Sequence, residues 1–362
     1  MKLFKSLLVA PATLGLLAPM AVSANEVTVN DFNAAEEIAV TNSRVDGLEA
    51  RFNDLEAGSF SETTTASFSA DFLVCAVDGC SNEAATFDYQ LGIGLETSFT
   101  GEDSLSATID IGNGDKAIAG TDGLNFDSTG DILFLDGLTY TFPLGGATVM
   151  VGDSTDISAV YTGACAYSAF TDYMGNCGTG SSVGVAGKGV TAAASYAFDS
   201  GFSLAGGISS QTILNEGKNN ESIPGILTEE GADVFGIEAA YSADSYGVTV
   251  AYADADTTTG WGINGYYAFD AVTLSAGVES VDDGATAEGF FVGLSFPEVG
   301  AGSLDIGMGT TGNFKDGDTE YYTYEASYAY PLNDDVTITP GIYIIEGASD
   351  VTGVALKTSF SF

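Results

Sequence analysis

The segment Phe87–Phe99 reads FDYQLGIGLETSF and alternates strictly between two kinds of residue. Its odd-numbered positions hold aromatic or aliphatic side chains and one Thr, and its even-numbered positions hold polar residues, acids or glycine. A period of two is typical of a β-strand with one apolar face. Sixteen such segments follow one another from Phe60 to the C-terminus. Because soluble sandwiches contain similar strands, the alternation alone predicts an all-β protein and no more.

The lengths of the connections distinguish a membrane barrel from a sandwich. The odd-numbered gaps between segments cover 75–86, 112–131, 152–189, 209–234, 253–260, 279–289, 309–321 and 345–353. The even-numbered gaps cover 100–104, 143–146, 199–201, 242–245, 270–271, 297–303 and 331–335, and each is shorter than every odd gap. Short turns on one rim and long loops on the other are typical of a transmembrane barrel, so we predict an antiparallel up-and-down β-barrel of about sixteen strands.

Aromatic residues support the same interpretation. On the apolar faces, the short-turn ends of the strands carry Phe99, Phe142, Phe198, Phe202, Tyr241, Tyr246, Phe269, Phe296, Tyr330 and Phe362. Membrane barrels have such a girdle at the level of the lipid headgroups. Two segments depart from the pattern. A change of phase at Asp136-Gly137 predicts a bulge, and Pro340 removes a hydrogen-bond donor from within a strand.

The composition excludes several classes of function. The 362 residues include 50 acids, only 9 Lys and Arg, and no His, so the net charge is −41. So few bases leave no basic surface for nucleic acid. Without His, an enzymatic barrel would lack the usual base beside its nucleophile, and we expect no enzyme. No stretch has the full spacing of a calcium loop or a phosphate loop, so we expect no metal and no cofactor.

The first 24 residues have the pattern of a secretory signal peptide. Lys2 and Lys5 precede an apolar run from Leu7 to Leu17, and the segment ends on Val22-Ser23-Ala24. The remaining chain divides into a predicted periplasmic helix within residues 25–58 and the predicted barrel over residues 59–362.

The predicted helix carries a heptad pattern. The a positions hold Ile38, Val45 and Phe52, and the d positions hold Thr41, Leu48 and Leu55. This spacing favours a short coiled coil that joins copies of the chain into a homo-oligomer. The alternative is an amphipathic helix that lies on its own domain. The heptads are too few to define the number of copies.

The junction between the helix and the barrel resembles a known family. The stretch Arg44–Arg51 (RVDGLEAR), with Phe60-Ser61 and Thr63-Thr64-Thr65 after it, is similar to the helix-to-barrel junction of cyanobacterial outer-membrane porins. That group is classed with the carbohydrate-selective, OprB-like porins, and some members are labelled iron uptake porins. The resemblance implies a trimer in the cell outer membrane with its helix in the periplasm. Family members usually carry an S-layer-homology domain before the helix, where this chain has only residues 25–32 after the predicted cleavage.

A barrel of about sixteen strands is too wide for its side chains to fill, so it leaves an aqueous channel. The strand positions that alternate with the apolar ones should face the channel. The charged residues at these positions are Asp71, Asp88, Glu96, Asp110, Glu238, Asp305 and Glu325, with Lys357 as the one base. Such a wall attracts cations and repels anions. The high acidity is also what a salty habitat would favour, and a cation preference is compatible with that explanation.

The longest gap, 152–189, follows the fifth strand. Loops of this length are usually functional, and by position it resembles the third long loop of general porins, which folds into the channel. We predict a constriction loop on which Asp153, Asp156 and Asp172 face the narrowest water. The alternative is a surface cap over the mouth of the barrel.

Four cysteines lie in the long gaps. In an oxidising compartment, local pairing of Cys165 with Cys177 and of Cys75 with Cys80 is favoured among the three connectivities.

Together these features predict an outer-membrane porin that passes small hydrophilic solutes and ions and prefers cations. Its expected partners are outer-membrane lipids, further copies of the chain, and small solutes or inorganic ions. Carbohydrate, nitrate, iron complexes and simple ions all pass hydrophilic pores, so the sequence does not name the solute. The alternative is a structural or adhesive anchor that presents the coiled coil, and electrical conductance separates the two.

Overall fold

The computed structural model describes residues 64–79, 85–114, 124, 126, 129–183, 189–210, 226–227, 233–255 and 258–362. The predicted signal peptide, the predicted helix with its heptad residues Ile38, Val45, Leu48, Phe52 and Leu55, and Cys80 lie outside these ranges. The described strands belong to one compact unit, Ser61–Phe362. Within the described ranges, no helix has the length and apolarity needed to cross a membrane.

Strands make up most of the described chain. They are β1 (Thr64–Asp78), β2 (Ala85–Thr97), β3 (Ser104–Gly112), β4 (Phe134–Leu144), β5 (Ala147–Thr155), β6 (Gly189–Ala197), β7 (Phe202–Ser210), β8 (Asp233–Ser242), β9 (Tyr246–Ala255), β10 (Thr258–Ala268), β11 (Thr273–Asp282), β12 (Thr286–Val299), β13 (Gly302–Thr310), β14 (Phe314–Lys315), β15 (Tyr322–Asn333), β16 (Val336–Ile345) and β17 (Val351–Ser361). The two-residue strand β14 pairs with β12 at the edge of a long loop.

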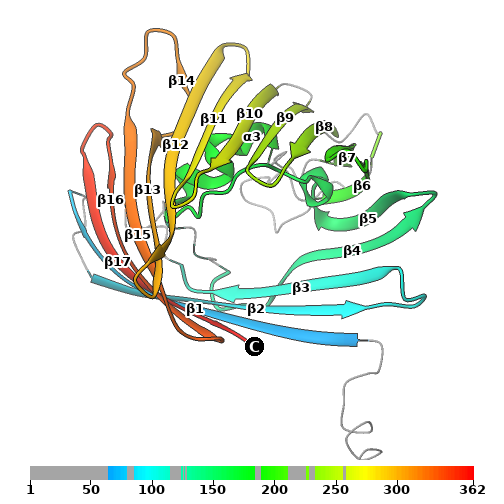
Figure 1. The fold of residues 1–362 in the computed structure, drawn as a ribbon, viewed down its shortest axis with the longest axis horizontal. Coiled ribbons are helices and arrows are strands. Elements are labelled where there is room, and N and C mark those ends of the chain that lie inside the picture. Colours follow the sequence, from blue (N-terminus) through cyan, green and yellow to red (C-terminus); the bar gives the residue numbers. More distant parts are fainter. Residues whose placement is uncertain are drawn as a thin grey trace, which may run out of the picture. The chain divides into compact units, whose positions relative to one another are not determined.

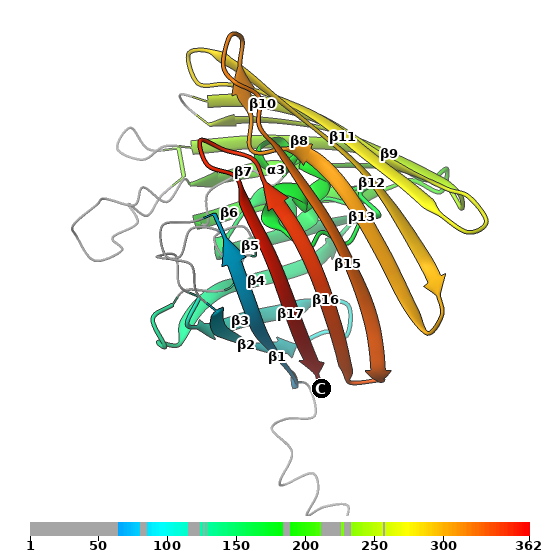
Figure 2. The same cartoon turned by 90° about the vertical axis from the view of Figure 1, so that its left-hand side faces the viewer.

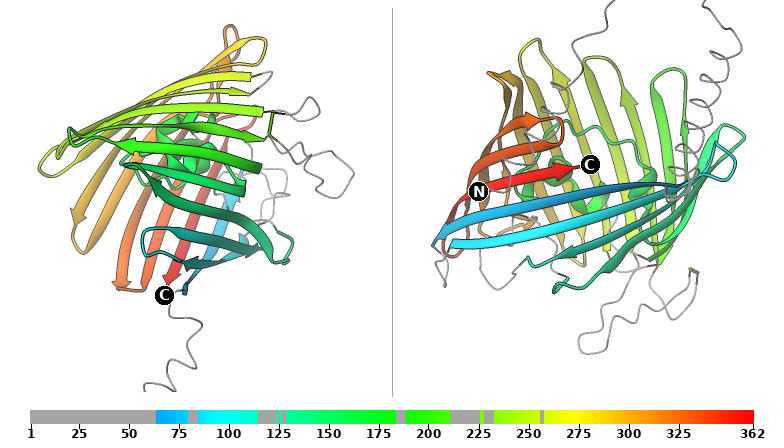
Figure 3. Two further views of the ribbon diagram at one scale, coloured as in Figure 1. Left: turned by 90° about the vertical axis from the view of Figure 1, so that its right-hand side faces the viewer. Right: turned by 90° about the horizontal axis from the view of Figure 1, so that it is seen from below.

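The other sixteen strands form a closed antiparallel barrel, each paired with its neighbours in chain order (Figures 1 and 2). The barrel closes between β1 and β17, from the pair Ser69 and Ser361 to the pair Asp78 and Thr352. Phe68 and the C-terminal Phe362 extend the seam, because each donates its N–H to the other's carbonyl at 2.8 and 3.0 Å. Figure 3 shows β1 and β17 side by side from below. The predicted barrel of about sixteen strands is confirmed.

The predicted difference between the two rims is correct only in part. The long connections 113–133, 156–188 and 211–232 all lie on one rim, which we call the long-loop rim. On that same rim, however, β9 and β10 are joined by residues 256–257 alone, fewer than the 98–103 turn of the opposite, short-turn rim. The strands there extend beyond their alternating segments, so the hairpins are tighter than the alternation indicates.

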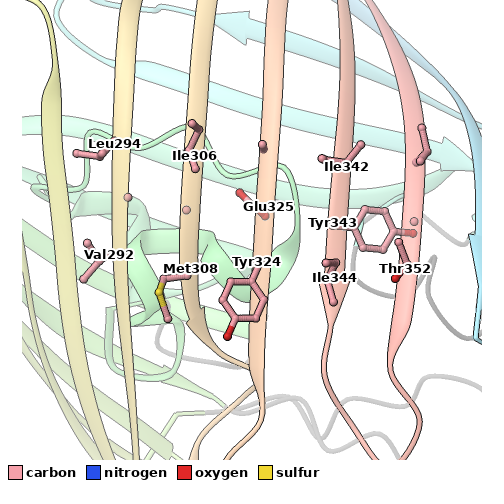
Figure 4. A pocket seen from close by; sticks show the side chains of 15 residues that line it. Val292, Leu294, Ile306, Met308, Tyr324, Glu325, Ile342, Tyr343, Ile344 and Thr352 are labelled. Carbon is pink, nitrogen blue, oxygen red and sulfur yellow. The ribbon is translucent and has the colours of Figure 1, made fainter.

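The outer face of the barrel is apolar. In Figure 4, Val292, Ile306 and Ile344 lie on the outside of β12, β13 and β16, whereas Glu325 and Tyr343 lie on the inner side of the wall. Eight of the ten predicted girdle residues, all but Phe296 and Tyr330, form rows of ring contacts along the short-turn rim, together with Phe68, Tyr140, Tyr196 and Tyr267. These rows include Phe99–Tyr140–Phe142, Tyr196–Phe198, Phe202–Tyr241–Tyr246–Tyr267–Phe269 and Phe68–Phe362. Such a surface fits lipid and its interface with water.

The two irregular segments behave as the sequence predicts. The register between β3 and β4 shifts at Thr108 and Ile109, which pair with Gly137 and Leu135, so Asp136 is the extra residue of a bulge. Pro340 leaves a gap in the ladder between β15 and β16, while the register is the same on both sides of it.

The turn between β2 and β3 is built around one carboxylate, Asp103. Its Oδ1 accepts hydrogen bonds from Ser98 Oγ at 2.9 Å and from the backbone N–H of Phe99 and Thr100 at 2.9 and 2.8 Å. Its Oδ2 accepts from the Tyr140 hydroxyl at 2.7 Å, which ties the turn to β4. Burial alone would raise the pKa of Asp103, but the hydrogen bonds from Thr100, Tyr140 and Ser98 outweigh it and hold the pKa well below its ordinary value.

Asp103→Asn should therefore destabilise the barrel in a pH-dependent way. A carboxyl whose pKa is lowered by folding stabilises the native state above its unfolded pKa, and that stabilisation is lost as the pH falls through the folded pKa. We expect the variant to unfold at a lower temperature than wild type at pH 7, with the difference narrowing below about pH 4. Circular dichroism melts in detergent across this range measure it. A difference that does not depend on pH would contradict the role of the ionised carboxylate.

Candidate functional site

The connection between β5 and β6 folds into the barrel instead of covering its mouth. It spans residues 156–188, of which 156–183 are described, and we call those the inner loop. The inner loop contains the short helices η3 (Ile157–Val160), η4 (Asp172–Gly178) and α3 (Gly180–Val183). They pack on the inner faces of strands from β5 to β13, and Figure 1 shows them within the ring of strands.

Local sequence features define the shape of the inner loop. Asp156 caps η3 by accepting a hydrogen bond from the N–H of Ser158 at 2.7 Å. Asn176 and Cys177 have φ values of 50° and 54°, which reverse the chain near the end of η4. A disulfide joins Cys177 to Cys165, with Cα atoms 5.6 Å apart, and links the outgoing and returning limbs of the loop. This is the local pairing that the sequence favours.

Glu325 of β15 holds the tip of the inner loop. Its Oε1 accepts hydrogen bonds from the Tyr167 hydroxyl at 2.9 Å and from Phe170 N–H at 2.8 Å. Its Oε2 accepts from Thr171 N–H at 2.7 Å and from Thr171 Oγ1 at 2.6 Å. Glu325 is only 4% exposed. The loop thus forms a cradle of four donors around one buried carboxylate, which satisfies backbone groups that no strand or helix pairs.

Two further glutamates hold the two limbs of the inner loop. Glu238 of β8 accepts from Thr162 N–H at 2.7 Å and from Gly163 N–H at 3.2 Å on the outgoing limb. Glu279 of β11 accepts from both the N–H and the Oγ of Ser182 on the returning limb, at 2.8 and 3.0 Å. Both glutamates are buried. The loop is therefore held at three separated positions on the wall.

Asp305 of β13 completes the row of buried acids under the inner loop. It accepts a hydrogen bond from Ser295 Oγ at 2.5 Å and one from the backbone of Ser168 in the loop. The described residues include only two bases, Lys315 and Lys357. Lys315 pairs with Asp283 at 2.9 Å on the long-loop rim, and Lys357 lies on β17. In the described structure, N–H and O–H donors therefore satisfy these four carboxylates.

Glycines on the inner wall make room for the loop. A Cβ at Gly293 or Gly307 would overlap the Tyr167 side chain, and a Cβ at Gly341 would overlap the Phe170 ring. Gly277 lets the Cys177 carbonyl approach β11 equally closely. Tyr167 also packs on Phe291 with ring centroids 4.8 Å apart. Inward-facing glycines thus lie among the buried carboxylates on this part of the barrel wall. The wall is therefore complementary to the inner loop in shape as well as in hydrogen bonding.

The structure changes the interpretation of the predicted pore-lining acids. Asp88, Glu238, Asp305 and Glu325 all point inward, but none is more than 5% exposed. The last three lie beneath the inner loop and accept its hydrogen bonds, so they do not face open water. Strand parity identifies the inward face correctly, but it carries no information about a loop that covers that face.

The three residues predicted to line the constriction do not all lie on the inner loop. Asp153 belongs to β5, which runs to Thr155 instead of ending at Val151, and it pairs with Leu138 of β4. A bulge between Gly152 and Thr155 carries the strand past the predicted end. Asp153 is therefore not part of the inner loop. Asp156 and Asp172 are, as the cap of η3 and the exposed first residue of η4.

Sequence reasoning missed Glu279 and Asn264. The predicted gap 279–289 places Glu279 in a loop, but β11 runs four residues further, to Asp282, and Glu279 faces inward like Ser275 and Gly277. Asn264 of β10 donates to Thr179 Oγ1 at 2.9 Å under the returning limb. The alternation of its strand places Asn264 on the inward face, but a neutral amide is not found by a search for charged pore residues.

Cys75 lies within β1 and not in the first long gap, where the alternation pattern places it. The Cys75 sulfur is buried and lies 3.3 Å from the Tyr343 hydroxyl. Cys80 is outside the described residues, so its pairing with Cys75 stays a prediction.

Part of the wall opposite the inner loop lines a cavity in the described structure. A cavity of about 740 Å³ lies against the inner faces of β1, β2 and β3 near the short-turn rim. Its lining includes Ser67, Ser69, Thr108, Glu96 and Asp110. Gly92 and Gly94 deepen it, because a Cβ on either would meet the hydroxyl of Ser69 or Ser67. Among the described residues, no group of His, Cys, Asp and Glu has the arrangement of a metal site.

Comparisons with known proteins agree with this architecture. OprB from Pseudomonas putida superimposes with a TM-score of 0.66 at 14% identity, over 83% of this chain and 94% of that one. A mutant of the Rh. blastica porin superimposes with a TM-score of 0.53 at 16% identity, over 83% of this chain and 100% of that one. An uncharacterized protein of Nostoc sp. is 24% identical over 98% of this chain and 75% of its own length.

A family model decides the assignment. The model described as Gram-negative porin matches residues 53–343, most of the chain. The chain belongs to the family of Gram-negative porins, which are channels of the outer membrane.

Proposed function

We propose that this porin is a water-filled channel that prefers cations and passes small hydrophilic solutes and inorganic ions by passive diffusion. The observation that carries the proposal is the charge of the open wall. Asp71, Glu96 and Asp110 project from β1, β2 and β3 on the side that the inner loop leaves uncovered, and Lys357 of β17 is the one inward-facing base in the described strands. Acidic walls in a channel of low-dielectric surroundings concentrate cations.

The inner loop supports a second part of the proposal, in which it narrows the channel. It occupies the interior along the arc from β5 to β16 and leaves an open cavity against β1, β2 and β3 near the short-turn rim. Nearer the long-loop rim, Leu73 and Cys75 of β1 are buried in an apolar cluster with Leu124 and Phe170. Asp172 lies exposed on this loop, beside a smaller polar cavity of about 200 Å³. The competing function is a structural anchor, which predicts no ion current.

Reversal potentials of the purified protein in planar bilayers test the ion preference. In a gradient of dilute KCl, we expect the sign of a cation-selective channel. The preference should weaken as the salt concentration rises, because charges are screened over about 8 Å at physiological ionic strength. An anion-selective sign would contradict the proposal, and a folded protein without conductance would favour the anchor.

The constriction is tested by removing the acceptor at the tip of the loop. Glu325→Ala leaves four donors without their partner, and unsatisfied buried groups cost about 1–3 kcal/mol each. We expect the loop to detach, with larger and noisier single-channel currents. Acetate in the bath should partly restore the wild-type current, because it replaces the missing acceptor.

Glu288→Ala is the matched control, since Glu288 is an exposed acid of β12, which is separated from β15 by β13. It should conduct like wild type with and without acetate. Heat-modifiable gel mobility reports that each variant is folded. Wild-type currents from folded Glu325→Ala would contradict a constriction held by this carboxylate.

A further inference from the structure

Two sets of acids on the inner wall have different surroundings, and the buried Asp88 of β2 belongs to neither. Under the inner loop, Glu238, Glu279, Asp305 and Glu325 are each 2–5% exposed and accept hydrogen bonds from the loop or from neighbouring strands. On the open wall, Glu96 is exposed and Asp110 is half-buried, and both line the 740 Å³ cavity. Equal formal charges therefore have unequal access to a passing ion.

Resting on the proposed cation channel, we propose that Glu96 and Asp110 are its ion-selecting residues, and that the carboxylates beneath the inner loop contribute little to selectivity. The selecting charge then lies on the barrel wall opposite the loop. It comes from two neighbouring strands, β2 and β3, instead of from the loop itself.

The register places these two carboxylates on one polar strip. Asp110 pairs with Gly92 and Ser106 pairs with Glu96, so Asp110 and Glu96 are four residues apart along the paired strands β2 and β3. The Asp110 Oδ1 lies 3.5 Å from the position that a Cβ of Gly92 would take, so the carboxylate spreads over the bare backbone of β2. Serine and threonine hydroxyls fill the space between the acids. A cation that moves along this strip meets oxygen atoms throughout.

Asp71 is a weaker member of the open wall. Its Oδ2 accepts a hydrogen bond from Gln90 Nε2 at 2.8 Å. Lys357 occupies the diagonal inward position across the β1–β17 seam, because it pairs with Leu73 while Asp71 pairs with Ser359. The opposite charge of Lys357 at this neighbouring position reduces the electric field of Asp71 in the channel water. Glu96 has no base at a corresponding position on the described strands β1 to β4.

The hydrogen-bonded acids under the loop cannot contact ions in the channel, and their electrostatic potential in the channel is reduced. Their oxygens are directed to loop donors and are covered by the loop's own atoms, so a hydrated ion in the open channel is separated from them by the thickness of the loop. The donor dipoles that surround each carboxylate also reduce its potential on the far side. The alternation of the strands alone predicts that these acids and Glu96 all face the channel water. The structure shows that only Glu96 is exposed.

The test compares two variants that each remove two formal negative charges. The first is Glu96→Gln with Asp110→Asn. The second is Glu298→Gln with Asp334→Asn, which neutralises two exposed acids of the short-turn rim outside the cavity. Reversal potentials in dilute KCl give the ratio of cation to anion permeability for both variants and for wild type. Heat-modifiable mobility confirms that each barrel is folded.

We expect the Glu96/Asp110 variant to lose most of its cation preference. A charge about 6 Å from a passing ion changes its occupancy roughly threefold in water, so the ratio should fall by at least that factor. The rim control should stay near wild type. If the double variant does not fold, the single variants E96Q and D110N are measured, and each should lower the ratio in the same direction.

The outcomes separate this inference from the proposed function. A cation-selective wild type whose ratio is unchanged in the folded Glu96/Asp110 variant would overturn the assignment of these two residues and leave the cation channel intact. An equal fall in the rim control would also overturn it, because the selectivity would then follow net charge. A wild type without cation preference would overturn both.

Discussion

The interior of this porin depends on hydrogen bonds from the backbone of the inner loop to carboxylates of the barrel wall. Glu238, Glu279 and Glu325 each receive at least one loop N–H within 2.8 Å. A loop inside a barrel has no strand partner for its N–H groups, and each unpaired buried group would be costly. The three glutamates supply those partners, and the disulfide between Cys165 and Cys177 keeps the two limbs at the matching spacing. The size and position of the water path follow from where the loop is held.

This arrangement assigns different tasks to acids that look alike. An acid under the loop is an acceptor that fixes the position of the backbone, and an acid on the open wall is a charge that acts on water and ions. Burial decides between the two tasks, since Glu325 is 4% exposed and Glu96 is exposed. The strong negative charge of the chain, −41, therefore overstates the charge that a solute in the channel encounters. We propose that the small set of acids that the loop leaves uncovered is what matters for transport.

Much of the barrel was predictable because membrane strands obey a strict local rule. Each strand must present apolar residues to lipid and polar residues to water, and segments such as Phe87–Phe99 show this directly. The bulge at Asp136 was visible for the same reason, as a break in the alternation. The fold of the inner loop was not predictable in detail, because its contacts join residues as distant as Thr171 and Glu325 and leave no periodic signal. Glycines such as Gly341 marked the docking surface, but nothing local related them to Phe170.

The most direct test of this arrangement is amide hydrogen exchange in the inner loop. Phe170, Thr171 and Ser182 lie outside the barrel strands, yet their N–H groups are donated to buried carboxylates at 2.7–2.8 Å. Exchange measured by NMR on the protein in detergent micelles should show these three amides protected to a degree similar to that of strand amides. Glu325→Ala should remove the protection of Phe170 and Thr171. Rapid exchange of all three amides in the wild-type protein would mean that the loop is not held in the barrel by these carboxylates.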